Sequence, residues 1–287
     1  MKDLALARAL LFTPGNRAER FAKAAATPAD GLIIDLEDAV GPADKAAARQ
    51  GVIEWLRGHG GFDRPDFLVC LRINSVYTTA GLADLRAVAE LARAGVVPDA
   101  MLVPTVESAV EIELVARHLR GAGAKGAGIA LVALIESALG LEHAPAIARA
   151  TPMLRTLGFG GADLAADLNC AFAWEPLLSA RSRVVQAAAG AGLAVLDVPY
   201  LDIDDDSGLA AECARVRGLG FTGKLAIHPR QVETIVGAFT PITAEIEHAR
   251  GVMAAYQAAA GGVCVYRGKM VDEPVMRAAR RALARSG

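Results

Sequence analysis

The segment GLIIDLEDAV, residues 31–40, contains both the pattern that predicts the fold and the charges that the fold must accommodate. Its apolar, β-branched start, from Leu32 to Ile34, predicts a strand buried on both faces, which is typical of a parallel sheet covered by helices. Three carboxylates follow within four positions: Asp35, Glu37 and Asp38. So much negative charge at the end of a buried strand is unfavourable unless it has a partner or a function.

The same pattern, a short apolar run followed by a helical segment, recurs along the chain. Strands are predicted at Ala9–Thr13, Gly31–Leu36, Phe67–Ile73, Ala100–Pro104, Gly128–Ile135, Thr156–Gly160, Ala194–Val198 and Lys224–Ile227. Helices are predicted at Arg17–Thr27, Asp44–Gly58, Thr79–Ala94, Ser108–Gly121, Leu141–Ala150, Pro176–Gly190, Gly208–Leu219 and Arg230–Ala238. Eight alternating units within roughly 240 residues predict an α/β fold, the (β/α)8 TIM barrel.

A doubly wound open sheet is the competing α/β architecture. The turn after the first predicted strand, Thr13-Pro14-Gly15-Asn16-Arg17, lacks the Gly-rich phosphate fingerprint GxGxxG of dinucleotide-binding sheets. The closed barrel is therefore favoured, with residues 1–240 as the catalytic domain.

Residues 241–287 are predicted to form a C-terminal helix and a lid segment. The pattern indicates a helix at Thr243–Ala260, a break at Gly261-Gly262, a short strand at Val263–Tyr266, a turn at Gly268 and a last helix that opens at Asp272. We expect the stretch after the glycine pair to be too short for a core of its own. Its apolar face is then expected to pack on another barrel, through Val271, Val275, Met276 and Ala279.

Composition excludes several classes of protein. The 287 residues are 53% apolar and have a net charge of −2 with interspersed signs, so nothing favours binding to nucleic acid or to an anionic membrane. The cysteines, Cys70, Cys170, Cys213 and Cys264, have no CxxC spacing, which predicts reduced thiols rather than disulfides or a zinc site. No apolar run approaches the ~18 residues of a membrane span and no signal-like segment opens the chain, so we expect a cytoplasmic protein.

The candidate site consists of the polar residues that follow the predicted strands, because TIM-barrel chemistry takes place at the carboxyl ends of the strands. These residues are Arg17, Glu37, Asp38, Arg72, Asn74, Thr105, Glu107, Glu136, Ser137, Asp163, Pro199, Tyr200 and His228. The carboxylates of the opening segment are therefore expected to face a shared central mouth.

Carboxylates gathered in a partly desolvated mouth raise one another's pKa unless a cation compensates them. Oxygen ligands without a His or Cys pair at ligand spacing favour a hard metal ion, Mg²⁺ before Mn²⁺, with water or substrate completing an octahedron. Arg72, at the end of a buried run, suits bidentate binding of a substrate carboxylate.

Several of these residues have a purely structural alternative. Asp38, Ser137 and Asp163 each follow a strand and would also serve only as caps of the next helix. His228 precedes a proline, and a structural hydrogen bond is its favoured role. Asp272 is well placed as the N-cap of the last helix.

Seven motifs carry a resemblance to a known family: RALLFTPGNRAERFAKA, DGLIIDLEDAVGPADKAAAR, LRIN, ALIESALGL, GFGGADLAADL, GKLAIHPRQ and GKMVDEPVMRAAR. Together they extend from about Arg8 to Arg281. In this order they resemble the HpcH/HpaI aldolase and citrate lyase β-subunit superfamily. Within it, the chain looks most similar to citrate lyase β-subunit-like proteins and to malyl-CoA or citramalyl-CoA lyases.

The resemblance implies a barrel that uses Mg²⁺ for reversible carbon–carbon cleavage of a β-hydroxyacyl thioester, of the malyl-CoA, citramalyl-CoA or citryl-CoA type. The products would be an acyl-CoA and an α-keto acid such as glyoxylate, pyruvate or oxaloacetate. Glu136 and Asp163 match the family's metal ligands. Glu37 and Asp38 match the pair that holds metal-bound water, and Arg72 matches the arginine that binds the keto acid.

The resemblance also implies an assembly and a site for CoA. Asp272 matches an acid of the C-terminal lid that reaches into a neighbouring subunit's site, so we expect a homo-oligomer, a trimer or a dimer of trimers. Arg17 and Arg20, after the first strand, are the candidate partners for the nucleotide phosphates of CoA, with Lys23 less favoured.

Two departures from the family pattern bear on the substrate. Asp163 is followed by Leu164 and not by a second acidic residue, and AIHP replaces the LINP associated with the citrate lyase subunit. The second departure favours a stand-alone CoA-ester lyase. The alternatives are the citryl-thioester lyase β subunit of a citrate lyase complex, which needs an acyl-carrier partner, and a catalytically idle barrel that serves as a scaffold.

Overall fold

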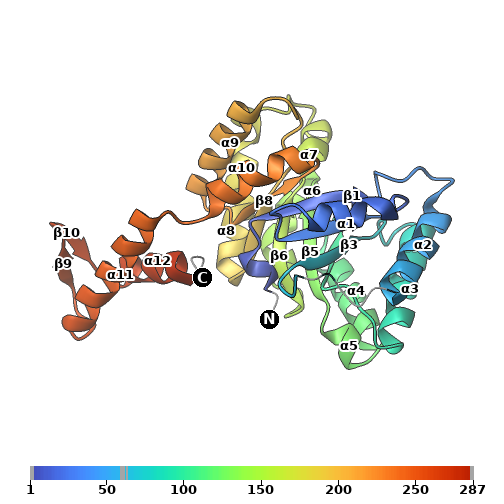
Figure 1. Cartoon of the computed structure of the whole chain (residues 1–287), viewed down its shortest axis with the longest axis horizontal. Coiled ribbons are helices and arrows are strands. Elements are labelled where there is room, and N and C mark those ends of the chain that lie inside the picture. Colours follow the sequence, from blue (N-terminus) through green and yellow to red (C-terminus); the bar gives the residue numbers. More distant parts are fainter. Residues whose placement is uncertain (1–2, 59–61, 63, 285–287) are drawn as a thin grey trace. The chain divides into compact units, whose positions relative to one another are not determined.

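The computed structural model describes residues 3–58, 62 and 64–284. In this part of the chain, eight parallel strands form a closed barrel in which each strand pairs with the next and β8 pairs with β1 (Figure 1). The strands are β1 (Ala9–Pro14), β2 (Gly31–Asp35), β3 (Leu68–Arg72), β4 (Ala100–Val103), β5 (Ala130–Ile135), β6 (Leu154–Phe159), β7 (Ala194–Asp197) and β8 (Gly223–Ala226). The closed order confirms the predicted (β/α)8 TIM barrel.

Helices connect the strands and form the outer layer of the barrel (Figure 1). The main ones are α2 (Lys45–Gly58), α3 (Thr79–Arg93), α4 (Ala109–Arg120), α6 (Ala138–Ile147), α8 (Trp174–Ala191), α9 (Asp206–Leu219) and α10 (Pro229–Phe239). Short elements are η1 (Leu4–Leu6), η2 (Ala18–Arg20), α1 (Phe21–Ala25), α5 (Ala124–Ala127) and α7 (Gly161–Asp167). The single helix predicted at residues 17–27 is thus η2 followed by α1, and α7 was not predicted.

Side-chain caps explain where two of the outer helices begin. Thr78 accepts a hydrogen bond from the Gly81 amide at the start of α3, and Ser137 accepts one from the Gly140 amide at the start of α6. The capping alternative for Ser137 is therefore confirmed. Asp38 lies in a turn well before α2 and caps no helix in the described chain.

The inward-facing side chains of the strands fill the barrel with an apolar core. Successive residues of a strand point to opposite faces, so alternate positions meet inside the barrel. The buried cluster includes Leu10, Ile33, Cys70, Leu102, Val132, Leu134, Leu196 and Leu225. Each fully buried aliphatic side chain of this kind contributes about 1.5–3 kcal/mol. Because this core fills the interior, the polar inward-facing side chains gather at the strands' carboxyl ends.

The chain divides into two compact units after Val236. The second unit contains α11 (Thr243–Ala258), the antiparallel pair β9 (Cys264–Tyr266) and β10 (Lys269–Val271), and α12 (Glu273–Ala284). Arg267 and Gly268, which join the two strands, both have positive φ, as a two-residue type I′ turn requires. The sequence predicted β9 and the turn at Gly268 but not β10.

The second unit has its own small core, which corrects one expectation. Val271 and Ala279 are buried against Ala249 and Val252 of α11, with Val275 packed beside them. The apolar face of the last helix is therefore covered within its own unit. The sequence had suggested instead that this face packs on another barrel. The expectation was wrong because α11, before the glycine pair, contributes to the same core.

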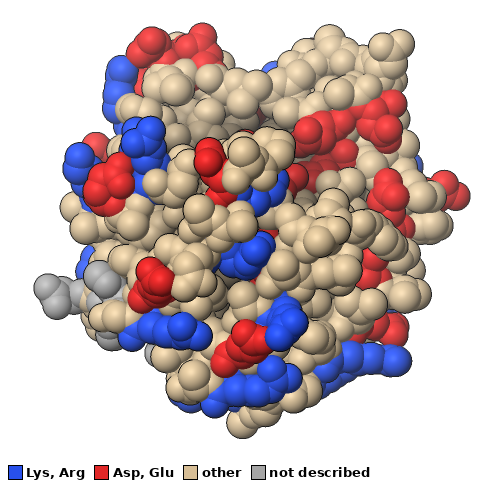
Figure 2. Space-filling view, turned by 90° about the vertical axis from the view of Figure 1, so that its right-hand side faces the viewer, with Lys and Arg blue, Asp and Glu red and all other residues tan. Residues whose placement is uncertain are grey.

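Charges of both signs lie on the face shown in Figure 2. Lys and Arg side chains are interspersed with Asp and Glu on its left and lower parts, whereas Asp and Glu gather at its upper right. None of the described helices is both long enough and apolar enough to cross a bilayer.

Candidate active site

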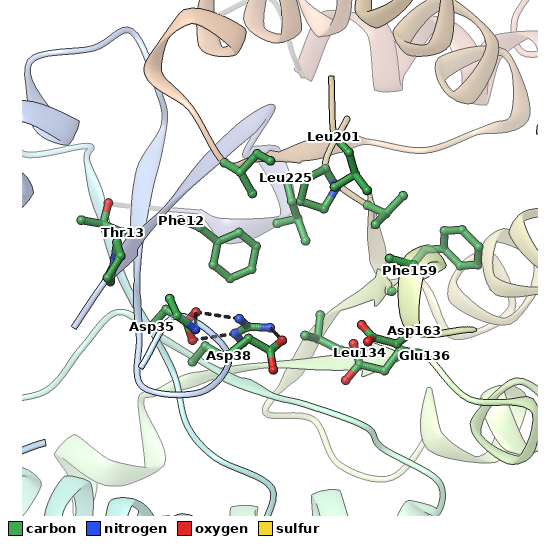
Figure 3. A pocket seen from close by; sticks show the side chains of 18 residues that line it. Phe12, Thr13, Asp35, Asp38, Leu134, Glu136, Phe159, Asp163, Leu201 and Leu225 are labelled. Atoms are coloured by element: carbon green, nitrogen blue, oxygen red, sulfur yellow. Dashed lines mark hydrogen bonds and ion pairs between the residues drawn. The ribbon is translucent and has the colours of Figure 1, made fainter. Parts of the chain in front are cut away.

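A pocket of about 390 Å³ opens at the carboxyl end of the barrel (Figure 3). Apolar side chains form much of its wall: Phe12, Leu134, Phe159, Val198, Leu201, Leu225 and Ile227. Its charged lining consists of Asp35, Asp38, Arg72, Glu136 and Asp163. Figure 3 shows Asp35 and Asp38 on one side of the pocket and Glu136 and Asp163 on the other. The strand ends thus bring together four carboxylates and, among the described lining residues, one cation.

Arg72 is held by Asp35, which is its neighbour across the β2–β3 pairing. Arg72 Nε and Nη2 donate to the two oxygens of Asp35 at 2.7 and 2.6 Å, and both side chains are largely buried. The Asp35 carboxylate also accepts hydrogen bonds from the backbone amides of Glu37 and Ala39, at 2.9 and 3.1 Å. The guanidinium carbon lies 4.7 Å from the centre of the Phe12 ring. These contacts fix the guanidinium in both position and orientation.

Glu37 and Asp38 approach the remaining nitrogen of Arg72. Arg72 Nη1 lies 2.8 Å from Glu37 Oε2 and donates to Asp38 Oδ2 at 3.2 Å. The Glu37 contact is an ion pair without hydrogen-bond alignment. The pKa of Glu37 is raised to about 8, mainly by burial; the charge of Arg72 opposes this rise, and the charges of Asp38 and Glu136 add to it. One guanidinium therefore does not neutralise this cluster.

The acidic turn that carries Glu37 and Asp38 is also fixed through its carbonyl groups. Lys45 Nζ donates to the carbonyls of Leu36 and Glu37 at 3.2 and 3.0 Å. Asn74 Nδ2 donates to the Leu36 carbonyl at 2.9 Å and to Asp84 at 2.6 Å. Asn74 was predicted to lie at the rim, and it is buried there as a support for this turn.

Glu136 is held by Thr105, which follows β4. Glu136 Oε1 accepts from the Thr105 amide at 2.6 Å and from its hydroxyl at 2.9 Å, and Thr105 has a φ of 46°. A positive φ is uncommon outside glycine, so this contact holds the backbone in a strained conformation. A Cβ at Gly160 would overlap the Cβ and Oε2 atoms of Glu136, so glycine is needed there. Burial raises the pKa of Glu136, and nearby Asp163 raises it further.

Asp163 lies in the first turn of α7 and not at its N-cap, which is Gly160. It is exposed at the pocket surface. Partial desolvation raises its pKa, and repulsion from Asp38 adds to this. Because α7 was not predicted, the sequence located Asp163 only by its place after β6.

The donor set of the pocket fits a hard cation. The charged side chains that line the pocket are four carboxylates and Arg72, so their negative charge exceeds the positive charge of Arg72. Within the described residues, no group of three or more His, Cys, Asp or Glu side chains is arranged as a metal cage. Mg²⁺ is commonly bound by one or two carboxylates, with waters and substrate as its other ligands. Glu136 and Asp163 match that mode of binding.

Other predicted residues lie elsewhere. Arg17 and Arg20 are exposed at η2 and do not line the pocket, and Lys23 is exposed on α1. His228 Nδ1 lies 3.3 Å from the Arg230 amide, in keeping with a structural role. Asp272 belongs to the second unit, where its Oδ1 accepts from the Val275 amide at 3.3 Å, which confirms that it caps α12.

Sequence reasoning missed the residues that hold the site together. Asp35 was noticed only as one of three carboxylates, because its place opposite Arg72 follows from the register of β2 and β3. Phe12 was read only as part of a strand, and Thr105 as one rim residue among many. Gln231 joins two rim loops, because its side chain accepts from the Ile227 amide and donates to the Tyr200 carbonyl.

Comparison with known proteins places the chain in a family. Residues 8–229 match the family model described as HpcH/HpaI aldolase/citrate lyase. The citrate lyase subunit beta of Escherichia coli strain K12 is 34% identical, over 97% of this chain and 93% of that protein. The L-malyl-CoA/beta-methylmalyl-CoA lyase of Cereibacter sphaeroides is 33% identical, over 92% of this chain and 90% of that protein.

A solved structure is similar over the whole chain. The CitE protein of Mycobacterium tuberculosis, in complex with magnesium, acetoacetate and coenzyme A, has a TM-score of 0.78 and 33% identity, and the match covers 99% of this chain and 100% of that one. The chain is therefore a carbon–carbon lyase, and it belongs to the HpcH/HpaI aldolase/citrate lyase family.

Proposed function

We propose that the protein cleaves a β-hydroxyacyl-CoA, of the malyl-CoA, citramalyl-CoA or citryl-CoA type, reversibly into an acyl-CoA and an α-keto acid. The observation that carries this proposal is the excess of carboxylates around one oriented guanidinium in a single pocket. Two similar proteins support it. One is named L-malyl-CoA/beta-methylmalyl-CoA lyase, and the other was solved in complex with magnesium, acetoacetate and coenzyme A.

Mg²⁺ is the proposed cofactor, with Mn²⁺ as a substitute. Glu136 and Asp163, which line the pocket, would hold the ion directly. Glu37 and Asp38, which both approach Arg72 Nη1, would orient water around it. When bound, the ion supplies Lewis-acid stabilisation of negative charge on the substrate's oxygen. Thr105 keeps Glu136 Oε1 occupied, so that Oε2 is the atom left to face the pocket.

The other steps of the proposed reaction involve side chains of the protein itself. The β-hydroxyl gives its proton to water, and its oxygen forms the carbonyl of the keto acid as the bond between the α and β carbons breaks. The electron pair of that bond moves to the thioester's α carbon, which then takes a proton. Arg72 would bind the carboxylate of the keto-acid half and balance its charge. The apolar wall that includes Phe12 and Leu225 would exclude water from the nascent carbanion.

The proton donor to the α carbon is proposed to be Asp272, contributed by a neighbouring copy in a trimer or a dimer of trimers. Its other oxygen, Oδ2, is not needed for the cap that Oδ1 makes. If the acid crosses between copies, mixing Asp272→Asn with Glu136→Gln protein, each inactive alone, should restore activity in hybrid oligomers. Failure to complement despite demonstrated subunit exchange would contradict a shared site.

Arg17 and Arg20 are proposed to contact the nucleotide phosphates of CoA, since both are exposed beyond the end of β1. Replacing both with glutamine should weaken acyl-CoA binding most at low salt and leave Mg²⁺ binding unchanged. Equal affinity before and after would place the phosphates elsewhere.

Turnover of purified protein tests the proposed function against its two alternatives. Release of a keto acid from CoA esters alone supports the stand-alone lyase. Turnover only with an acyl-carrier thioester would favour a citrate lyase β subunit, an alternative supported by the similarity to the E. coli subunit. Metal binding without turnover of any thioester would favour the scaffold.

A further inference from the structure

The contacts of Arg72 restrict how it can bind a substrate. A guanidinium has five N–H donors and two edges that can bind a carboxylate at two points, the Nε–Nη2 edge and the Nη1–Nη2 edge. The first edge is occupied, because Nε and Nη2 donate to the two oxygens of Asp35 at 2.7 and 2.6 Å. The ring of Phe12 covers one face of the same group. Only the Nη1–Nη2 edge is left for the pocket.

Asp35 is itself fixed, and it has no oxygen to spare for the substrate. Its carboxylate accepts two bonds from Arg72 and one each from the Glu37 and Ala39 amides, and its side chain is 2% exposed. It therefore orients Arg72 and the acidic turn together, from the last residue of β2.

We propose that Asp35 is a positioning residue for the lyase reaction, which directs the Nη1–Nη2 edge of Arg72 at the keto-acid carboxylate. The proposal rests on the proposed function and deepens it, since it assigns the edge by which the substrate is bound. Nη1 also lies 2.8 Å from Glu37 Oε2, without hydrogen-bond alignment. A substrate carboxylate at this edge takes the place of Asp38, which Nη1 binds at 3.2 Å through a side chain that is 67% exposed.

The same strand provides a matched control. Asp30, just before β2, accepts from Nε and Nη2 of Arg8 at 3.2 and 2.6 Å and from the amides of Arg8 and Ala9. This pair lies at the opposite end of the strand and does not line the pocket. If Asp35 served only to stabilise the fold, Asp30→Asn and Asp35→Asn would have the same kind of effect.

The kinetic test compares Asp35→Asn, Asp35→Glu and Asp30→Asn in the condensation of acetyl-CoA with glyoxylate or pyruvate, whichever the wild type accepts. Asp35→Asn should lower kcat/KM for the keto acid roughly 10- to 100-fold and leave the KM for acetyl-CoA within about twofold. Asp35→Glu keeps the charge but moves it, and should not restore activity. Asp30→Asn should lower the Tm and leave kcat/KM unchanged. Full activity of Asp35→Asn, or full rescue by Asp35→Glu, would overturn the proposal.

A second readout does not depend on turnover. In ¹⁵N spectra of arginine side chains, the Nε–H signal of Arg72 is identified as the one that is missing from Arg72→Lys. In the wild type, this signal should be protected from exchange with water. In Asp35→Asn it should move to the position of exposed arginines, and in Asp30→Asn it should stay. An unchanged signal in Asp35→Asn would overturn the positioning role. If this signal behaves as expected while no keto acid reacts even in the wild type, the proposed function fails and the assignment of the edge remains.

Discussion

The two ends of strand β2 carry the same kind of Asp–Arg pair in different surroundings. At the start, Asp30 binds Arg8 through Nε and Nη2 and accepts two backbone amides. At the end, Asp35 binds Arg72 through the same two nitrogens and also accepts two backbone amides. In both pairs, two adjacent strands are tied by an Asp–Arg fork. Their hydrogen bonding alone does not distinguish them.

The surroundings of the two pairs differ in charge and in burial. The side chains of Arg8 and Asp30 are 29% and 20% exposed, and Asp66 is the only further charge that affects the pKa of Arg8 among those identified. Arg72 and Asp35 are 11% and 2% exposed and have Glu37, Asp38, Glu136 and Asp163 nearby. The pair at the start of β2 has one further acidic side chain identified near it and stabilises the barrel, whereas the buried pair in the pocket has four and requires a further cation. The surplus of negative charge therefore indicates function, and the ion pair itself does not.

The largest expected effect comes from removing the surplus carboxylates. Glu136→Gln and Asp163→Asn should each lower kcat on the order of 10²–10³-fold and weaken Mg²⁺ binding measured by calorimetry, because each removes a charged oxygen from the proposed Mg²⁺ site. Asp30→Asn is the control at the other end of the strand. It should cost about 1–3 kcal/mol of stability and leave Mg²⁺ binding intact. Mg²⁺ affinity equal to wild type in both site variants would place the ion elsewhere.

The next largest effect is expected from changing the shape of the Arg72 side chain. Arg72→Lys keeps the charge but loses the planar fork, so the ammonium cannot satisfy both oxygens of Asp35 and still reach the substrate. We expect kcat/KM in the condensation direction to fall by about tenfold or more, mostly through a higher KM for the keto acid. Arg8→Lys should leave both constants unchanged. If the two lysine variants behave alike, the comparison between the two ends fails.

A smaller effect is expected in the pH dependence of metal-free stability. The pKa of Glu37 is about 8 in the folded protein, against an ordinary value of 4.5. The folded state therefore binds this proton more tightly than the unfolded state. The stability that the bound proton adds to the folded state is fully present below pH 4.5 and is lost as pH rises from there to 8. Between pH 6 and 8.5 the Tm of the metal-free protein should fall by a few degrees.

Two controls sharpen this expectation. Glu37→Gln should flatten the pH dependence, because the titrating group is gone. Saturating Mg²⁺ should flatten it too, because a cation favours the ionised carboxylate. A Tm that rises between pH 6 and 8.5 without metal would contradict the account of Glu37.

The barrel could be predicted because its signal is periodic and repeated. Each buried strand, such as Leu68–Arg72, is a short apolar run, and each outer helix has its own apolar stripe. Once the barrel is predicted, its geometry gathers the residues after the strands, which is why Glu136, Asp163 and Arg72 could be named as one group. Sequence order supplied the list of candidates and the fold supplied their proximity.

The support of the site could not be predicted, because it depends on pairing and on local geometry. That Asp35 lies opposite Arg72 follows from the β2–β3 register, which a sequence does not state. The positive φ of Thr105, which aims its amide at Glu136, has no sequence signal, since threonine rarely adopts it. The core of the second unit was missed because α11 lies on the other side of a glycine break from its partners.

The central claim is that the acidic end of β2 and its neighbours use a divalent cation to break a carbon–carbon bond, while the end that carries Asp30 does not. The most direct test is keto-acid release from malyl-CoA and citramalyl-CoA after removal of metal by EDTA, followed by titration with Mg²⁺. The account predicts no release without metal, saturable recovery with Mg²⁺ in the wild type and in Asp30→Asn, and no recovery in Glu136→Gln. Release that persists in EDTA, or full recovery in Glu136→Gln, would contradict it.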